Sequence, residues 1–199
     1  HVALPSGMVF VIGLSGVSAE KTGAAQARYN RASDATAADL AAWNDHTKRA
    51  DRSLAAAVRS AEDAPATLSR ILEPELATRV EHFVRESEVL VPAAAEALAA
   101  ADLAAFGAVA AESQQLTETL LGNQVPETIA LAATARELGA VAASAFGAGF
   151  GGSVWALVPR ADAGAFASDW LARHRAAFPH RVHADTLVTD AAAGRGGAQ

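Results

Sequence analysis

The chain has 199 residues, 51% of them hydrophobic, and a formal net charge of −6. This charge argues against a protein that binds nucleic acids or acidic membranes, because such a protein would need a basic face. Because it contains no cysteine, it can form neither a disulfide framework nor a thiolate metal site. It shows no apolar run of membrane-spanning length, and from its first residues we expect no signal peptide. We therefore expect a soluble, cytoplasmic protein, and the start at His1 rather than Met suggests a piece of a longer one.

The first half of the chain predicts one strand followed by helices. Met8–Leu14 (MVFVIGL) is a continuous, largely β-branched apolar run, which is typical of a buried strand. Pro92 should kink or restart a helix, because proline lacks the N–H that a helix interior needs. Helical patterns cover residues 21–32, 34–62, 68–72 and 75–90, the last of them clearly amphipathic.

The second half predicts two helices and then a strand-rich end. Asp102 is a suitable N-cap for a helix that Gly122 and Asn123 would end. Pro126 suits a helix start, and Gly139 would stop that helix. Later segments predict a short apolar strand over 141–146, a strand over 153–158, a helix over 161–178 and a strand over 181–189.

This order of elements predicts an α+β fold, with an antiparallel sheet and helices packed on one face. Residues 1–190 would form a single domain, and the Ala- and Gly-rich residues 191–199 would form a disordered tail. Trp43, Trp155 and Trp170 lie on apolar faces and are expected in the core.

Residues 147–152 (GAGFGG) match the pattern G-x-G-x-x-G, and we call them the glycine loop. A dinucleotide fingerprint needs a helix after the glycines, whereas here the strand-like 153–158 follows, so that interpretation fails. A Walker-A loop fails as well, since no Gly-Lys-Ser/Thr follows. Two interpretations stay open: a tight hairpin turn, and a loop whose backbone approaches a ligand closely.

Several segments resemble galactokinases of the GHMP kinase family. Residues 146–158 (FGAGFGGSVWALV) resemble the third conserved motif of that family, and residues 10–30 resemble the strand and helix that open its C-terminal region, including the pair Tyr29-Asn30. Weaker similarities lie at 79–86 (RVEHFVRE), 102–107, Glu112-Ser113 and 125–127. Two departures stand out: Ser144-Ala145-Phe146 replaces a basic residue and a Thr before the loop, and Ser113-Gln114 replaces a Ser-His pair.

The resemblance implies the C-terminal part of an ATP-dependent kinase that phosphorylates galactose or a related sugar at the anomeric hydroxyl. It implies ATP and Mg²⁺ as cofactors, with their ligands and the catalytic residues mainly in an N-terminal half of the same protein, so this piece alone would be inactive. The sugar-binding residues that it implies here are Tyr29, Gly147, Gly149, Gly151 and Gly152.

Two other classes of function remain open at this point. One is a non-catalytic module, related to GHMP kinases, that binds a sugar or a partner. The other is an Ala-rich dimerisation domain. His82 and Glu86 have the i, i+4 spacing of a metal pair, but no third ligand is evident, so we expect His82 to face solvent or to pack between helices. We expect His174, His180 and His183 to form a surface cluster around the turn at Phe178-Pro179.

Overall fold

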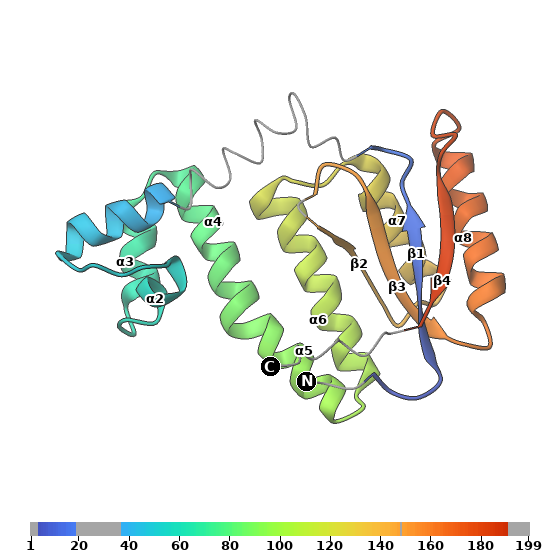
Figure 1. Ribbon diagram of the computed structural model, residues 1–199, viewed down its shortest axis with the longest axis horizontal. Helices are drawn as coiled ribbons and strands as arrows, with labels where there is room; N and C mark the ends of the chain where they lie inside the picture. The colour runs from blue at the N-terminus through green and yellow to red at the C-terminus, as the bar shows by residue number, and fades with distance from the viewer. Residues whose placement is uncertain (1–3, 19–36, 148, 191–199) are drawn as a thin grey trace, which may run out of the picture.

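The computed structural model describes residues 4–18, 37–147 and 149–190. A four-stranded sheet with three long helices forms one end of the molecule, and a group of short helices forms the other (Figure 1). Residues 37–47 are also helical. The remaining elements, with η marking π-helical turns, are β1 Met8–Leu14, α2 Leu54–Val58, α3 Ala64–Ile71, α4 Pro74–Val84, η1 Arg85–Leu90, α5 Val91–Ala99, α6 Leu103–Leu116, η2 Thr117–Leu121, α7 Pro126–Glu137, β2 Ala142–Phe146, β3 Ser153–Pro159, α8 Ala163–Ala177 and β4 Asp185–Thr189.

The sheet has the strand order β2-β3-β1-β4, and every neighbouring pair is antiparallel. This arrangement confirms the predicted α+β fold. β1 occupies the predicted residues, but β4 starts at Asp185 rather than at residue 181. The reason is a turn: the N–H of Arg181 donates to the carbonyl of Phe178, and the N–H of Ala184 donates to the carbonyl of Arg181.

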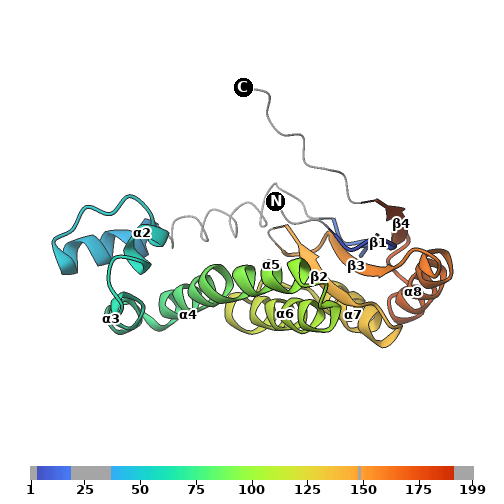
Figure 2. The ribbon, with the colours of Figure 1, turned by 90° about the horizontal axis from the view of Figure 1, so that it is seen from below.

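α7 and α8 cover one face of the sheet, as the view from below shows (Figure 2). Alternate residues of β1 and β3, such as Val11 and Ala156, point into this core. Trp170 of α8 is fully buried there, and its indole N–H donates to the carbonyl of Leu131. A Cβ on Gly13 would lie 2.8 Å from the Trp170 ring, so the glycine makes room for the indole.

α6 runs along the outer edge of β2. Asp102 caps its start, as predicted, by accepting from the N–H of Ala105. A Cβ on Gly107 would lie 2.1 Å from the carbonyl oxygen of Val141, so the glycine allows the helix to approach the strand closely. α6 therefore shields one edge strand from pairing with other chains.

α4, η1 and α5 follow one another without an intervening turn, so Pro92 does not break the helix. The π-helical turn η1 lies just before the proline, and the N–H of Val91 donates to the carbonyl of Glu86, five residues earlier. The predicted helix over 75–90 is thus a helix with a wider last turn, which accommodates the missing N–H of Pro92.

The expected helix over 34–62 is interrupted. Lys48 adopts a left-handed φ of 57°, and a new helix, α2, starts only after the N-cap Ser53. Asp51 holds the intervening turn, because it accepts from the indole N–H of Trp43 at 2.8 Å and from Arg49 at 2.7 Å. Trp43 is buried as predicted, in a second small core with Leu54, Val58, Leu68 and Val80.

Candidate functional site

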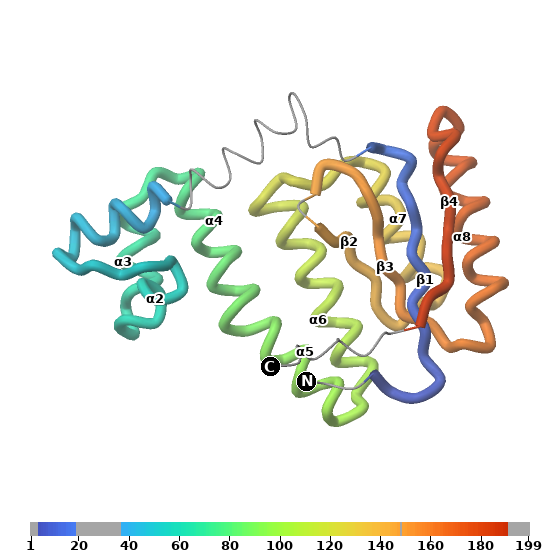
Figure 3. Tube along the Cα trace, viewed as in Figure 1, coloured from blue at the N-terminus to red at the C-terminus, as the bar shows by residue number. Residues whose placement is uncertain are grey.

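The glycine loop joins β2 to β3 at the end of the sheet where β1 finishes (Figure 3). Among its described residues the φ angles are 88° at Gly147, 83° at Gly149, 61° at Phe150, 125° at Gly151 and 85° at Gly152. L-residues rarely adopt this region of φ, so the glycines are needed for the path of the backbone.

Two of the glycines are also needed because the loop packs against its own chain. A Cβ on Gly149 would lie 2.2 Å from the carbonyl oxygen of Asn123, which accepts from the N–H of Phe150. A Cβ on Gly151 would lie 2.8 Å from Cγ1 of Val17. The close approach at these positions is therefore intramolecular, and contact with a ligand stays a prediction.

The following glycine ties the loop to the end of β1. The N–H of Gly152 donates to the carbonyl of Val17 at 3.0 Å, and its own carbonyl accepts from the N–H of Ser15 at 2.9 Å. Gly147 differs, since a Cβ there would meet no atom within 4 Å. The loop is thus clamped on both sides at 149–152, and at Gly147 it borders open space.

Gln114 of α6 supports the strand that leads into the loop. It is 1% exposed, and its Oε1 accepts from the N–H of Ala145 at 2.7 Å and from the hydroxyl of Ser144 at 3.1 Å. Its Nε2 donates to Glu118 at 2.7 Å. The two departures from the family pattern, at Gln114 and Ser144, are therefore in direct contact and form a neutral hydrogen-bonded pair.

Glu127, at the start of α7, anchors the turn before β4. Its side chain is 7% exposed and accepts from Arg181 at 2.7 Å, with His180 at 3.8 Å. Burial pushes the pKa of Glu127 up, but the backbone hydrogen bond and Arg181 outweigh it, so the pKa lies below its usual range. A Cβ on Gly16 would lie 2.9 Å from Cβ of Arg181, so this glycine lets the turn close onto the end of β1.

The prediction that His174 belongs to a surface cluster of histidines is wrong. His174 is 4% exposed, and its Nε2 lies 3.1 Å from the carbonyl oxygen of Ser15. It belongs to α8, on the face that covers the sheet, whereas His180 and His183 lie beyond the helix and are exposed. Trp155 also differs from expectation, because it lies on the second face of the sheet and is only partly buried.

His82 and Glu86 do not form a metal site with other described residues. Glu86 accepts from the hydroxyl of Ser113 at 3.1 Å. Burial lowers the pKa of His82, although Glu86 acts in the opposite direction. Within the described ranges, no group of three His, Asp or Glu side chains is arranged to hold a metal ion.

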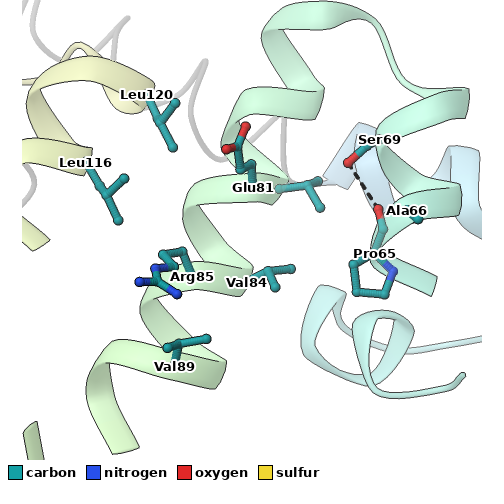
Figure 4. A pocket seen from close by; sticks show the side chains of 10 residues that line it. Pro65, Ala66, Ser69, Glu81, Val84, Arg85, Val89, Leu116 and Leu120 are labelled. Carbon is teal, nitrogen blue, oxygen red and sulfur yellow. Dashed lines mark hydrogen bonds between the residues drawn. The ribbon is translucent and has the colours of Figure 1, made fainter. Parts of the chain in front are cut away.

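A hollow of about 490 Å³ lies between α3, α4 and η2 (Figure 4). Val84, Val89, Leu116 and Leu120 make most of its lining apolar, and none of the lining residues belongs to the sheet or the glycine loop. The guanidinium of Arg85, which also lines it, is already paired with Glu112 at 2.6 Å. The hollow brings no catalytic set of side chains together.

Sequence reasoning missed the partners of the glycine loop. Val17 and Asn123 act through backbone carbonyls and packing, which no residue-type pattern reveals. Gln114 was visible only as a departure from the family pattern. Tyr29, predicted to bind sugar, lies outside the described residues, as does the predicted tail at 191–199.

Comparisons with known proteins agree with this geometry. Residues 94–176 match the family model described as the C-terminal domain of GHMP kinases. The structure of Lactococcus lactis galactokinase complexed with galactose is similar over 97% of this chain and 47% of its own, with 25% identity and a TM-score of 0.76. L. major mevalonate kinase in complex with R-mevalonate is similar in fold over 97% of this chain and 45% of its own, with 17% identity and a TM-score of 0.52.

The chain thus spans about half the length of these two structures. No curated protein matches it by sequence. In the part of the chain that the structure describes, no helix is both long and apolar enough to cross a membrane. Residues 94–176 thus match the C-terminal domain of GHMP kinases, and the chain as a whole has a fold similar to that of about half of a galactokinase.

Proposed function

We propose that this chain is the C-terminal part of an ATP-dependent sugar kinase that phosphorylates galactose or a related sugar at the anomeric hydroxyl. The observation that carries the proposal is the clamped glycine loop in a fold that matches a galactokinase over 97% of the chain. A hairpin turn alone does not require Val17 on one side and Asn123 on the other. Such a clamp suits a loop whose backbone must hold a fixed position beside a ligand.

Phosphoryl transfer depends mainly on positioning and on electrostatic stabilisation of the transferred group. In the proposed site, Gly147, Gly149, Gly151 and Gly152 present backbone to the sugar and the transferring phosphoryl group. Open space beside Gly147 leaves that side of the loop accessible. Tyr29 supplies a phenol hydroxyl to a sugar hydroxyl, since a phenol can both donate and accept a hydrogen bond.

ATP supplies the phosphoryl group, and Mg²⁺ supplies the positive charge that neutralises the negative charge of that group. The described residues offer no set of three acidic or histidine ligands, so we assign the metal ligands and the phosphate cradle to an N-terminal half of the same protein. It follows that this chain is inactive alone, and that the complete enzyme works in the cytoplasm, where ATP is available.

An ADP-release assay on the 199-residue chain and on the protein with its upstream sequence tests the proposal. The expected result is sugar-dependent ADP release by the longer protein and none by the isolated chain. Normal turnover by the isolated chain would contradict the assignment of catalysis to the missing half. Sugar binding by the longer protein without any turnover would instead favour the non-catalytic module.

A further inference from the structure

The hollow between α3, α4 and η2 has the size and the lining of a small-molecule site. Its volume of about 490 Å³ is that of an ordinary ligand pocket. Apolar side chains from all three elements line it, among them Ala66 of α3, Val84 of α4 and Leu120 of η2 (Figure 4). An apolar molecule that enters this hollow is therefore removed from water on several sides.

The charges at the hollow favour a cation. Glu81 of α4 lines the hollow and is exposed, and it forms no ion pair with another residue of the described ranges. Arg85, at i+4 from Glu81, would be a suitable partner, but it is paired with Glu112 of α6 at 2.6 Å. Two carboxylates and one guanidinium thus leave one negative charge without a counter-ion, which attracts a cation and repels an anion.

One wall of the hollow belongs to the segment that holds the glycine loop. Leu116 follows shortly after Gln114, which accepts from the backbone of β2, and Leu120 shortly precedes Asn123, whose carbonyl accepts from the N–H of Phe150 in the loop. Between these two attachments lies η2, of which no residue is buried. A loosely packed π-helical turn can be ordered further by a molecule that packs against it, and such turns often occur at functional sites.

We propose that this hollow binds a small organic cation with an apolar body, and that the bound molecule restrains η2 and through it the glycine loop. The apolar body packs against Leu116 and Leu120, and the cationic group lies beside Glu81. Ordering of η2 steadies the Asn123 carbonyl, so the ligand acts on the loop without touching it. The site goes beyond the proposed function, because neither a sugar nor an N-terminal half takes part in it.

Three probes with the same aromatic body and different charge test the binding: phenethylamine, phenethyl alcohol and hydrocinnamate. Methyl NMR of the 199-residue chain should show ring-current shifts at Leu116 and Leu120 on addition of the amine. The amine should bind about threefold tighter than the alcohol, and hydrocinnamate should bind most weakly. Equal affinities, a preference for hydrocinnamate, or no shifts at these two leucines would overturn the proposal.

Variants identify the groups that bind. Glu81→Gln should abolish the preference for the amine over the alcohol. Glu75→Gln, at an exposed position of the same helix that does not line the hollow, should keep that preference. Ala66→Phe adds a ring at an exposed lining position and should weaken the binding of the amine and the alcohol several-fold. Circular dichroism checks that each variant folds, and if one does not, the three probes on the unsubstituted chain decide.

Hydrogen exchange measured by NMR tests the link to the glycine loop. Saturation with phenethylamine should slow the exchange of the Phe150 N–H several-fold. The control is the N–H of Arg160, which donates to the carbonyl of Gly7 at the opposite end of the sheet and should exchange equally with and without the amine. Unchanged exchange at Phe150 in the presence of bound amine would overturn the proposed restraint of the loop. Since no turnover is measured, a longer protein that phosphorylates no sugar would contradict the proposed function and leave this result standing.

Discussion

Gln114 accepts a hydrogen bond from the backbone N–H of Ala145 at 2.7 Å and so joins α6 to the last residues of β2 before the glycine loop. Gln114→Leu should lower the free energy of unfolding by about 1–3 kcal/mol, because the Ala145 N–H and the Ser144 hydroxyl lose their acceptor in a buried place. Urea unfolding measures the change. In the longer protein we also expect lower turnover.

The neighbouring Gln115 provides the matched control, since its side chain is exposed on the same helix. Gln115→Leu should change the unfolding free energy by no more than about 0.5 kcal/mol. Ser144→Ala removes one donor and leaves the bond to Ala145, so its effect should lie between the two. Equal stability of the Gln114→Leu and Gln115→Leu variants would show that Gln114 does not hold β2.

Gly149→Ala should destabilise the protein more than Gly139→Ala. Both glycines have positive φ, 83° and 90°, which costs an L-residue about 1–2 kcal/mol. Only at Gly149 does the new Cβ also meet an atom, the Asn123 carbonyl oxygen at 2.2 Å. Thermal unfolding of the two variants measures the difference, and the same melting temperature for both would contradict the clamped loop.

Gly147→Ala separates a functional loop from a structural turn. Gly147 has the same positive φ and the same open surroundings as Gly139, so the two Ala variants should lose similar stability. If the loop backbone lies beside the substrate, Gly147→Ala should lower the kcat/KM of the longer protein for sugar, while Gly139→Ala should not. Unchanged kinetics for both would leave the loop with only a structural role.

We expect the folded protein to lose the stabilising effect of the Glu127–Arg181 pair in acid. The pKa of Glu127 is lower in the folded protein, so the pair contributes stability above the unfolded pKa of about 4.3 and loses it as pH falls through the folded pKa. The difference in unfolding free energy between the wild type and Glu127→Gln should therefore shrink below about pH 4.3. Glu137, exposed and 3.7 Å from Arg173, is the control, and Glu137→Gln should change stability little at any pH. A difference for Glu127→Gln that stays constant with pH would contradict the role of the pair.

Tyr29→Phe in the longer protein should raise the KM for sugar more than the KM for ATP. The substitution removes one hydroxyl and keeps the ring, so it removes only the proposed hydrogen bond to a sugar hydroxyl. Steady-state kinetics with each substrate varied in turn measures both constants. An equal rise in the two KM values would argue against contact with the sugar.

The sequence predicted the parts of the fold that depend on local patterns. The apolar run at Met8–Leu14, the Asp102 cap and the stop at Gly122 all act within a few residues, and each is present. The break after residue 47 was missed, because it depends on Asp51 accepting from Trp43, a contact that no helical pattern encodes.

Of the candidate site, only the glycines could be predicted from the sequence. Residue type identifies a loop with positive φ, but it does not identify the carbonyl oxygens that hold the loop from elsewhere in the chain. Val17 and Asn123 are ordinary residues at positions set by the sheet and by the end of η2. His174 was misplaced for a similar reason, since its burial depends on which face of α8 meets the sheet.

Phosphorus NMR of the longer protein with galactose and MgATP tests the central proposal most directly. The account predicts that the ATP resonances decline as ADP and a sugar 1-phosphate appear together, and that the isolated 199-residue chain produces neither. An unchanged ATP spectrum with galactose and with related sugars, from a longer protein that is folded, would contradict it.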